Sequence, residues 1–259
     1  MAQQAVNFDP SVGDDTSAAL RKHDNNIADI LAQIARVGGV FPITYISGLM
    51  FARASNTTVA VYAGAAWVPG LGKLVEVQGT VVTPAATLAA SAMYHLYLTQ
   101  LNGVASVELS GTPPAAYVGF SYTKSGDSTR RYVGSMVTDA SGALIDCWCP
   151  RPGVLRYIST IGNMRPVSNG LATTAAAVSI SNLVPVTARG LALQVYNGGS
   201  PATGFVGIAA NTQLINIQPG TKVIIDDLPV TSPAFTYNMS GATNTAGLYV
   251  DLLGYSFER

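Results

Sequence analysis

Charged residues are scarce in this chain. Only 11% of its 259 residues are charged, with 14 Lys and Arg against 14 Asp and Glu, whereas ordinary soluble domains carry about 25%. So sparse and balanced a charge lacks the clustered basic surface that phosphate backbones require, and we expect no nucleic-acid partner. Few charges also protect a monomer poorly against association. The composition therefore favours a subunit covered largely by other subunits, and the alternative is a stable secreted β protein.

Cysteine and histidine are also scarce. The two cysteines, Cys147 and Cys149, flank Trp148, and in a strand such side chains share a face but are poorly placed to bridge each other. A zinc site would need further Cys or His ligands, and the chain has only His23 and His95. We therefore expect buried reduced thiols, no metal site and no cofactor.

Long apolar runs are missing as well. Uncharged stretches such as residues 78–107 and 190–221 are broken by Pro, Gly, Asn and Gln, so we expect no membrane insertion. The segment Met1–Ala5 lacks the basic-then-apolar pattern of a secretory signal. This predicts assembly in a cytoplasm.

One segment has a helical pattern, residues 14–37. Asp14 or Asp15 can cap its start and Gly38 and Gly39 end it. A single short helix cannot bury an apolar seam by itself, and isoleucine at both a and d positions favours trimers or tetramers over dimers. The sequence therefore predicts a trimeric, coiled-coil-like helix in an N-terminal segment of residues 1–40. The predicted trimer-interface residues are Leu20, His23, Ile27, Ile30, Ile34 and Val37.

After Gly39 the pattern changes to the period of two that is typical of strands, with frequent turn signals such as Asn102-Gly103. This predicts a mainly β fold with two antiparallel sandwich or barrel domains, residues 41–162 and 163–259. The expected strands are residues 58–62, 73–77, 94–98, 104–109, 116–122, 132–138, 144–148, 154–158, 175–183, 188–196, 204–209, 212–217, 222–227 and 247–257.

The chain has few motifs that are typical of catalysis. The chain has no Gly-x-Ser-x-Gly nucleophile elbow and no phosphate-binding glycine loop. His95 alternates with apolar neighbours, as a strand-face histidine does. We therefore expect no catalytic residue and no enzyme. Few carboxylates could form a glycosidase pair from distant positions, namely Glu76, Glu108, Asp127, Asp139, Asp146 and Asp251.

Two loops in the last hundred residues are the most ligand-like, residues 197–203 and 237–244. Rigid scaffolds place binding residues on such connections, and charge-poor loops suit a neutral ligand such as a surface glycan. Tyrosines such as Tyr196 and Tyr237 could offer sugar-stacking platforms. The alternatives are turns chosen for backbone geometry and tyrosines that belong to cross-strand pairs or core. The candidate ligand residues are Asn197, Ser200, Thr203, Tyr237, Asn238 and Asn244.

The segment Val12–Leu31 resembles one common near the start of tailed-bacteriophage fibre and tail proteins, where a Gly-Asp precedes a short helix with a Lys and Asn-rich positions. His23-Asp24 departs from the commoner Ile-Asn, so a polar layer interrupts the seam. The middle of the chain resembles a β module of phage tail fibres. The matching segments, which extend the resemblance over roughly residues 10–160, are residues 46–49, 53–55, 57–59, 64–69, 94–97 and 130–142.

The resemblance implies a homotrimeric virion protein that is assembled in the host cytoplasm. Its N-terminal region would bind other virion proteins, and its C-terminal domain would point outward. The leading interpretation is a short tail fibre whose C-terminal domain binds a host receptor, such as a surface glycan. Two alternatives stay open: a head fibre or capsid-decoration trimer, and a tailspike-type enzyme that degrades glycans.

Overall fold

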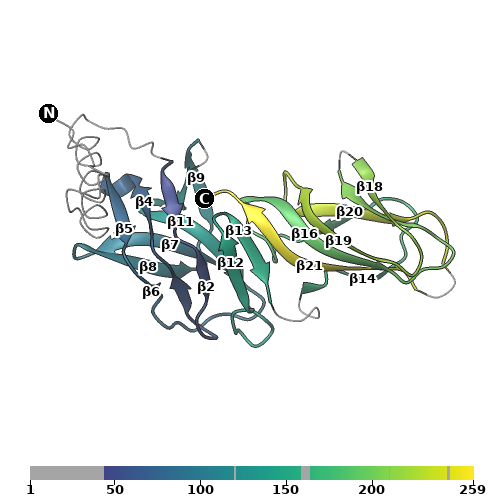
Figure 1. The fold of residues 1–259 in the computed structure, drawn as a ribbon, viewed down its shortest axis with the longest axis horizontal. Helices are drawn as coiled ribbons and strands as arrows, with labels where there is room; N and C mark the ends of the chain where they lie inside the picture. The colour runs from purple at the N-terminus through teal and green to yellow at the C-terminus, as the bar shows by residue number, and fades with distance from the viewer. Residues whose placement is uncertain (1–43, 120, 159–163, 210, 244–245) are drawn as a thin grey trace, which may run out of the picture. The chain divides into compact units, whose positions relative to one another are not determined.

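Every pair of neighbouring strands in the described part of the chain is antiparallel (Figure 1). The computed structural model describes residues 44–259 except for 120, 159–163, 210 and 244–245. Within these residues the fold is mainly β, as predicted, and no helix there is long and apolar enough to cross a membrane. The predicted helix lies outside the described residues, together with its seam of Leu20, His23, Ile27, Ile30, Ile34 and Val37.

Two sheets come from the first half of the described chain. A three-stranded sheet has the order β1–β4–β5, and a five-stranded sheet has the order β8–β7–β11–β10–β9. Asn102 and Gly103 connect β7 to β8 with positive φ angles of 50° and 84°, so the predicted hairpin is confirmed. The bounds are β1 (Ile46–Gly48), β4 (Gly64–Val68), β5 (Lys73–Val77), β7 (Met93–Leu101), β8 (Val104–Ser110), β9 (Pro114–Val118), β10 (Ser121–Lys124) and β11 (Asp127–Val137), with a 3-10 turn η2 (Pro69–Leu71) before β5.

A nine-stranded sheet has the order β19–β16–β21–β13–β12–β2–β3–β6, and β14 also pairs with β21. Residues 44–259 form one compact unit, and this sheet contains strands from before and after residue 163. The predicted domain boundary at that residue falls on positions that are not described and stays a prediction. The strands are β2 (Phe51–Arg53), β3 (Val59–Val61), β6 (Val81–Val82), β12 (Cys147–Arg151), β13 (Val154–Tyr157), β14 (Val167–Gly170), β16 (Ala188–Asn197), β19 (Lys222–Pro229) and β21 (Leu248–Phe257).

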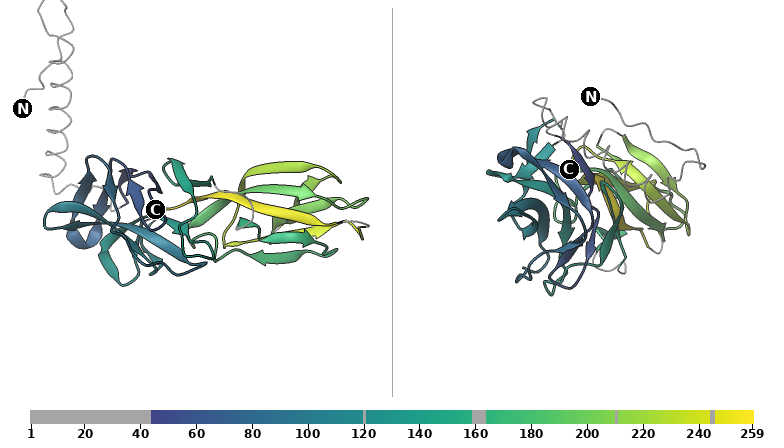
Figure 2. Two further views of the ribbon diagram at one scale, coloured as in Figure 1. Left: turned by 90° about the horizontal axis from the view of Figure 1, so that it is seen from below. Right: turned by 60° about the vertical axis from the view of Figure 1, so that its left-hand side comes forward.

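A four-stranded sheet packs against the β14 and β21 part of the nine-stranded sheet (Figure 2). The two sheets approach so closely that two positions at their contact are glycine. A Cβ on Gly204 would lie 2.7 Å from the Leu248 side chain, and one on Gly170 would lie 2.5 Å from the Tyr237 ring. The strand order is β15–β20–β17–β18, with bounds β15 (Ala176–Ser179), β20 (Ala234–Met239), β17 (Gly204–Ile208) and β18 (Asn211–Ile217).

An aromatic cluster joins the five-stranded sheet to the last strand of the nine-stranded sheet. Its centre is the fully buried ring of Tyr132 on β11. The rings of His95, Tyr97, Tyr122 and Phe257 all lie 6.0–6.4 Å from it, centroid to centroid. Such tilted and edge-on aromatic pairs add to the stabilisation that burial alone provides. This packing ties the end of β21 to a sheet formed much earlier in the chain.

Two strand predictions need correction. The predicted strand 116–122 is two strands, β9 and β10, because Gly119 has a φ of 58° and turns the chain back on itself. Strand β20 is not among the predicted strands, and neither are β1, β2, β4, β6 and β14. Tyr237 and Asn238, which the sequence places in a ligand loop, lie on β20 and pair with β17. The cysteines are as predicted: Cys147 and Cys149 are buried and unbridged.

Candidate functional site

Asn197, the first residue of one predicted ligand loop, is fully buried. Its side-chain amide donates to the carbonyls of Ala202 at 3.0 Å and Ile217 at 2.9 Å, and its Oδ1 accepts from the backbone N–H of Gly199 at 2.8 Å. These bonds set the shape of the 197–203 loop. The side chain of Asn197 is therefore used inside the protein and is closed to a surface ligand.

The two predicted loops lie side by side, because Ser240 Oγ accepts from the backbone N–H of Thr203 at 3.0 Å. Of the other candidates, Ser200 is exposed, Thr203 and Tyr237 are half-buried, Asn238 is buried, and Asn244 lies outside the described residues. Ligand binding by these loops stays a prediction. A larger group of aromatic, polar and charged side chains lies next to these loops, on the nine-stranded sheet.

Two tyrosines form the aromatic part of this group. Tyr196 on β16 and Tyr249 on β21 are directly paired, and their rings stack with centroids 6.1 Å apart and planes 27° apart. Gln194 and Asp251, two residues along, are also paired and lie on the same face, because side chains alternate along a strand. Lys222 on β19 is paired with Tyr196 from the other side. Three neighbouring strands therefore present one continuous row of aromatic and polar groups.

Arg165, just before β14, contacts the two members of this row that lie on β21. Its Nε donates to Asp251 Oδ1 at 2.7 Å and its Nη2 donates to Oδ2 at 3.1 Å, and its guanidinium lies 5.3 Å from the centre of the Tyr249 ring. The hydrogen bond to Asp251 raises the pKa of Arg165, while Gln194 Nε2 adds a longer bond to Oδ2 at 3.4 Å. The nearly buried carboxylate is thereby paired and held in a fixed orientation.

These residues line a cavity of about 420 Å³ together with Gly198 and Ala246. A Cβ on Gly198 would lie 3.1 Å from the Ala246 Cβ and 3.4 Å from a ring carbon of Tyr196, so glycine keeps this edge open. Tyr196 is 40% exposed. The cavity, called the tyrosine pocket below, offers an aromatic face beside an amide, a carboxylate and an ammonium group. This is the mixture that orients a polar ligand with apolar faces.

Two members of this pocket are predicted from the sequence, Tyr196 as a stacking platform and Asp251 as a carboxylate. Arg165, Gln194, Lys222 and Tyr249 are not. The only local signal for Tyr249 is that it alternates with Asp251 along the final strand. Its pairing with Tyr196 is a long-range property of the sheet.

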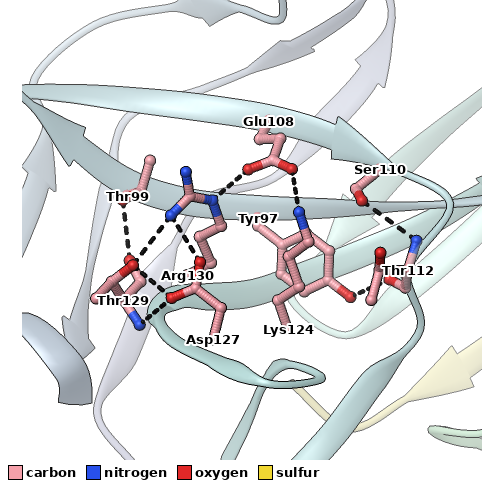
Figure 3. Close-up of polar contacts among 9 residues, drawn as sticks. All are labelled: Tyr97, Thr99, Glu108, Ser110, Thr112, Lys124, Asp127, Thr129 and Arg130. Atoms are coloured by element: carbon pink, nitrogen blue, oxygen red, sulfur yellow. Dashed lines mark hydrogen bonds and ion pairs between the residues drawn. The ribbon is translucent and has the colours of Figure 1, made fainter.

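A second charged cluster lies on the five-stranded sheet (Figure 3). It borders a cavity of about 410 Å³. Glu108 on β8 accepts hydrogen bonds from Lys124 on β10 and Arg130 on β11, and Arg130 Nη1 also donates to Asp127 Oδ2 at 2.8 Å. Burial raises the pKa of Glu108, but the bonds from Lys124 and Arg130 outweigh burial and leave it lowered. The pKa of Asp127 is lowered as well, chiefly by its bond from Thr129.

This cluster supports a structural role. A general acid at neutral pH needs a raised pKa, and neither of these carboxylates has one. The two cations and two anions neutralise each other, and their side chains cross-link three strands (Figure 3). The expectation that the chain has no catalytic residue stays a prediction.

The described part of the chain contains no group of three or more His, Cys, Asp or Glu side chains that could hold a metal ion. Comparisons with protein-family models, with curated proteins and with solved structures find no match. The tyrosine pocket, defined by its geometry alone, is therefore the basis of the functional argument.

Proposed function

We propose that this chain is a structural protein of a tailed-bacteriophage virion, a short homotrimeric fibre whose C-terminal part binds a host surface glycan. In this proposal a trimeric helix precedes two β-sandwich domains, and the N-terminal region binds other virion proteins. The resemblance over residues 10–160 and the scarcity of charge support the assembly role. The observation that carries the binding role is the tyrosine pocket.

The pocket fits a sugar for a physical reason. A pyranose ring has an apolar face of C–H groups that packs on an aromatic ring, while its hydroxyls need donors and acceptors around the edge. Tyr196 supplies an exposed ring, and Gln194 and Lys222 provide polar groups beside it. A single small site of this kind binds weakly. Three copies in one trimer would raise the overall avidity by about 10²–10⁴ without any new contact.

The binding role is tested with the full chain and two tyrosine variants of similar exposure. Tyr196 is 40% exposed in the pocket, and Tyr62 is 43% exposed elsewhere. We expect Tyr196→Ala to reduce adsorption to susceptible cells and binding to their purified surface glycan at least tenfold, and Tyr62→Ala to leave both unchanged. A well-folded wild-type trimer that binds neither cells nor glycan overturns the receptor role and favours a capsid-decoration trimer.

The assembly role is tested by measuring the molecular mass of the purified protein in solution. We expect light scattering at micromolar concentration to give a trimer. Replacing Ile27 and Ile30 by Ala should shift it toward monomer, because large-to-small changes in a buried seam cost about 2–5 kcal/mol each. A wild-type monomer contradicts the trimeric helix.

A further inference from the structure

We propose that the tyrosine pocket selects an anionic saccharide, one whose sugar ring carries a carboxylate or a phosphate. This inference rests on the proposed glycan-binding function and names the class of sugar that the pocket prefers. Its basis is the arrangement of charge around Tyr196, together with the register that sets Lys222 beside that ring.

The pocket lining carries one more positive charge than negative. Arg165 and Asp251 neutralise each other through two hydrogen bonds. Lys222 is the third charged residue of the lining. It is exposed, and no carboxylate lies within ion-pair distance of it among the described residues. The nearest acidic residue on the same face of β19 is Asp226, four positions along, and it faces Arg156 at 3.7 Å.

Lys222 is positioned to contact a ligand that stacks on Tyr196. The two residues are directly paired across β16 and β19, so their Cβ atoms are about 5 Å apart and both side chains stand on the same face. An exocyclic acid on a stacked pyranose lies within reach of a lysine ammonium at that spacing. Gln194, two residues along from Tyr196, is paired with Ile224 on β19 and with Asp251 on β21. Because the charge of Asp251 is neutralised by Arg165, the amide side of the pocket suits hydroxyl groups.

The remaining contacts of the pocket argue against a purely neutral ligand. Asp251 already accepts three hydrogen bonds, from Arg165 twice and from Gln194, so it has little capacity left to accept from sugar hydroxyls. A neutral sugar would therefore leave the ammonium of Lys222 without an acceptor of opposite charge. An anionic sugar pairs it, and a charge-assisted bond is the stronger kind.

The experiment compares one sugar in three forms, a neutral hexoside, the matching uronide and the matching 6-phosphate, by titration calorimetry on the full chain. Because the ion pair would be partly exposed, we expect at least one of the two anionic forms to bind about fivefold tighter than the neutral form. The preference should disappear between about 0.01 M and about 1 M salt, because salt screens exposed charges. The uronide and phosphate arms identify which anionic group the pocket prefers.

Two lysine variants provide the matched test. Lys222→Gln should abolish the preference for the anionic form, so that the variant binds the neutral and anionic forms with equal affinity. Lys73→Gln removes another exposed strand lysine and should change nothing. Equal affinity for all three forms, lost in Tyr196→Ala, overturns this inference and leaves the glycan-binding function intact. Absence of binding to all three forms and to host glycan overturns both.

Discussion

His95 lies on β7 with its side chain in the core, where it is 5% exposed. Its Nδ1 is 2.7 Å from Ser135 Oγ, and that oxygen is also 2.7 Å from the hydroxyl of Tyr132. Both neighbours are neutral, so nothing in contact with the ring compensates a charge on it. Burial accordingly lowers the pKa of His95 from 6.5 to about 4. The folded protein therefore holds this imidazole in its neutral form at physiological pH.

The lowered pKa makes stability depend on pH. Between pH 4 and 6.5 the unfolded chain binds a proton that the folded protein does not, so the contribution is complete above about pH 6.5 and is lost as pH falls. A shift of this size amounts to about 3 kcal/mol in total, and about 2 kcal/mol of it is lost between pH 7 and pH 5. At pH 5 most carboxylates are still ionised, so the effect of the histidine can be separated from theirs.

The assay is urea unfolding, followed by the fluorescence of Trp67 and Trp148, at pH 7, 6 and 5. The variant His95→Asn keeps a polar group near Ser135. We expect it to be less stable at pH 7 but to lose the decline of about 2 kcal/mol toward pH 5. An equal decline in wild type and variant would refute the reasoning. The second histidine, His23, provides the control: His23→Leu should leave this slope unchanged and remove only the loosening of trimer contacts that we expect below about pH 6.

Three further predictions concern the core. Gly134→Ala places a methyl group against a buried phenylalanine ring and should lower the thermal midpoint, at a cost of about 1–3 kcal/mol, whereas Gly79→Ala, with open space around it, should have little effect. Asn197→Ala leaves buried loop carbonyls without donors and should destabilise the protein by about 2–4 kcal/mol in urea unfolding. Because burial raises the pKa of both thiols, Cys147 and Cys149 should resist a thiol reagent at about pH 8 until urea is added; rapid labelling of the folded protein would contradict this.

Most strands could be predicted from local pattern. The final strand illustrates this: residues 247–257 were expected, and β21 spans Leu248–Phe257. Errors occurred where a short-range signal was ambiguous. Gly119 could have continued a strand or turned it, and only the pairing of β9 with β10 decides the matter. Asn197 is predicted as a ligand residue because rigid scaffolds place binding residues on such loops, whereas in the structure its hydrogen bonds are satisfied within the loop.

The sequence alone determined the class of secondary structure and the hairpin at Asn102-Gly103, because alternation and turn chemistry depend only on residues close together in the chain. The tyrosine pocket required the tertiary structure. Tyr196 meets Tyr249, and Arg165 meets Asp251, only because β21 enters the sheet between β16 and β14 in one register. That register is selected by the burial of the opposite faces of these strands, and a shift of one residue would turn every pocket side chain inward.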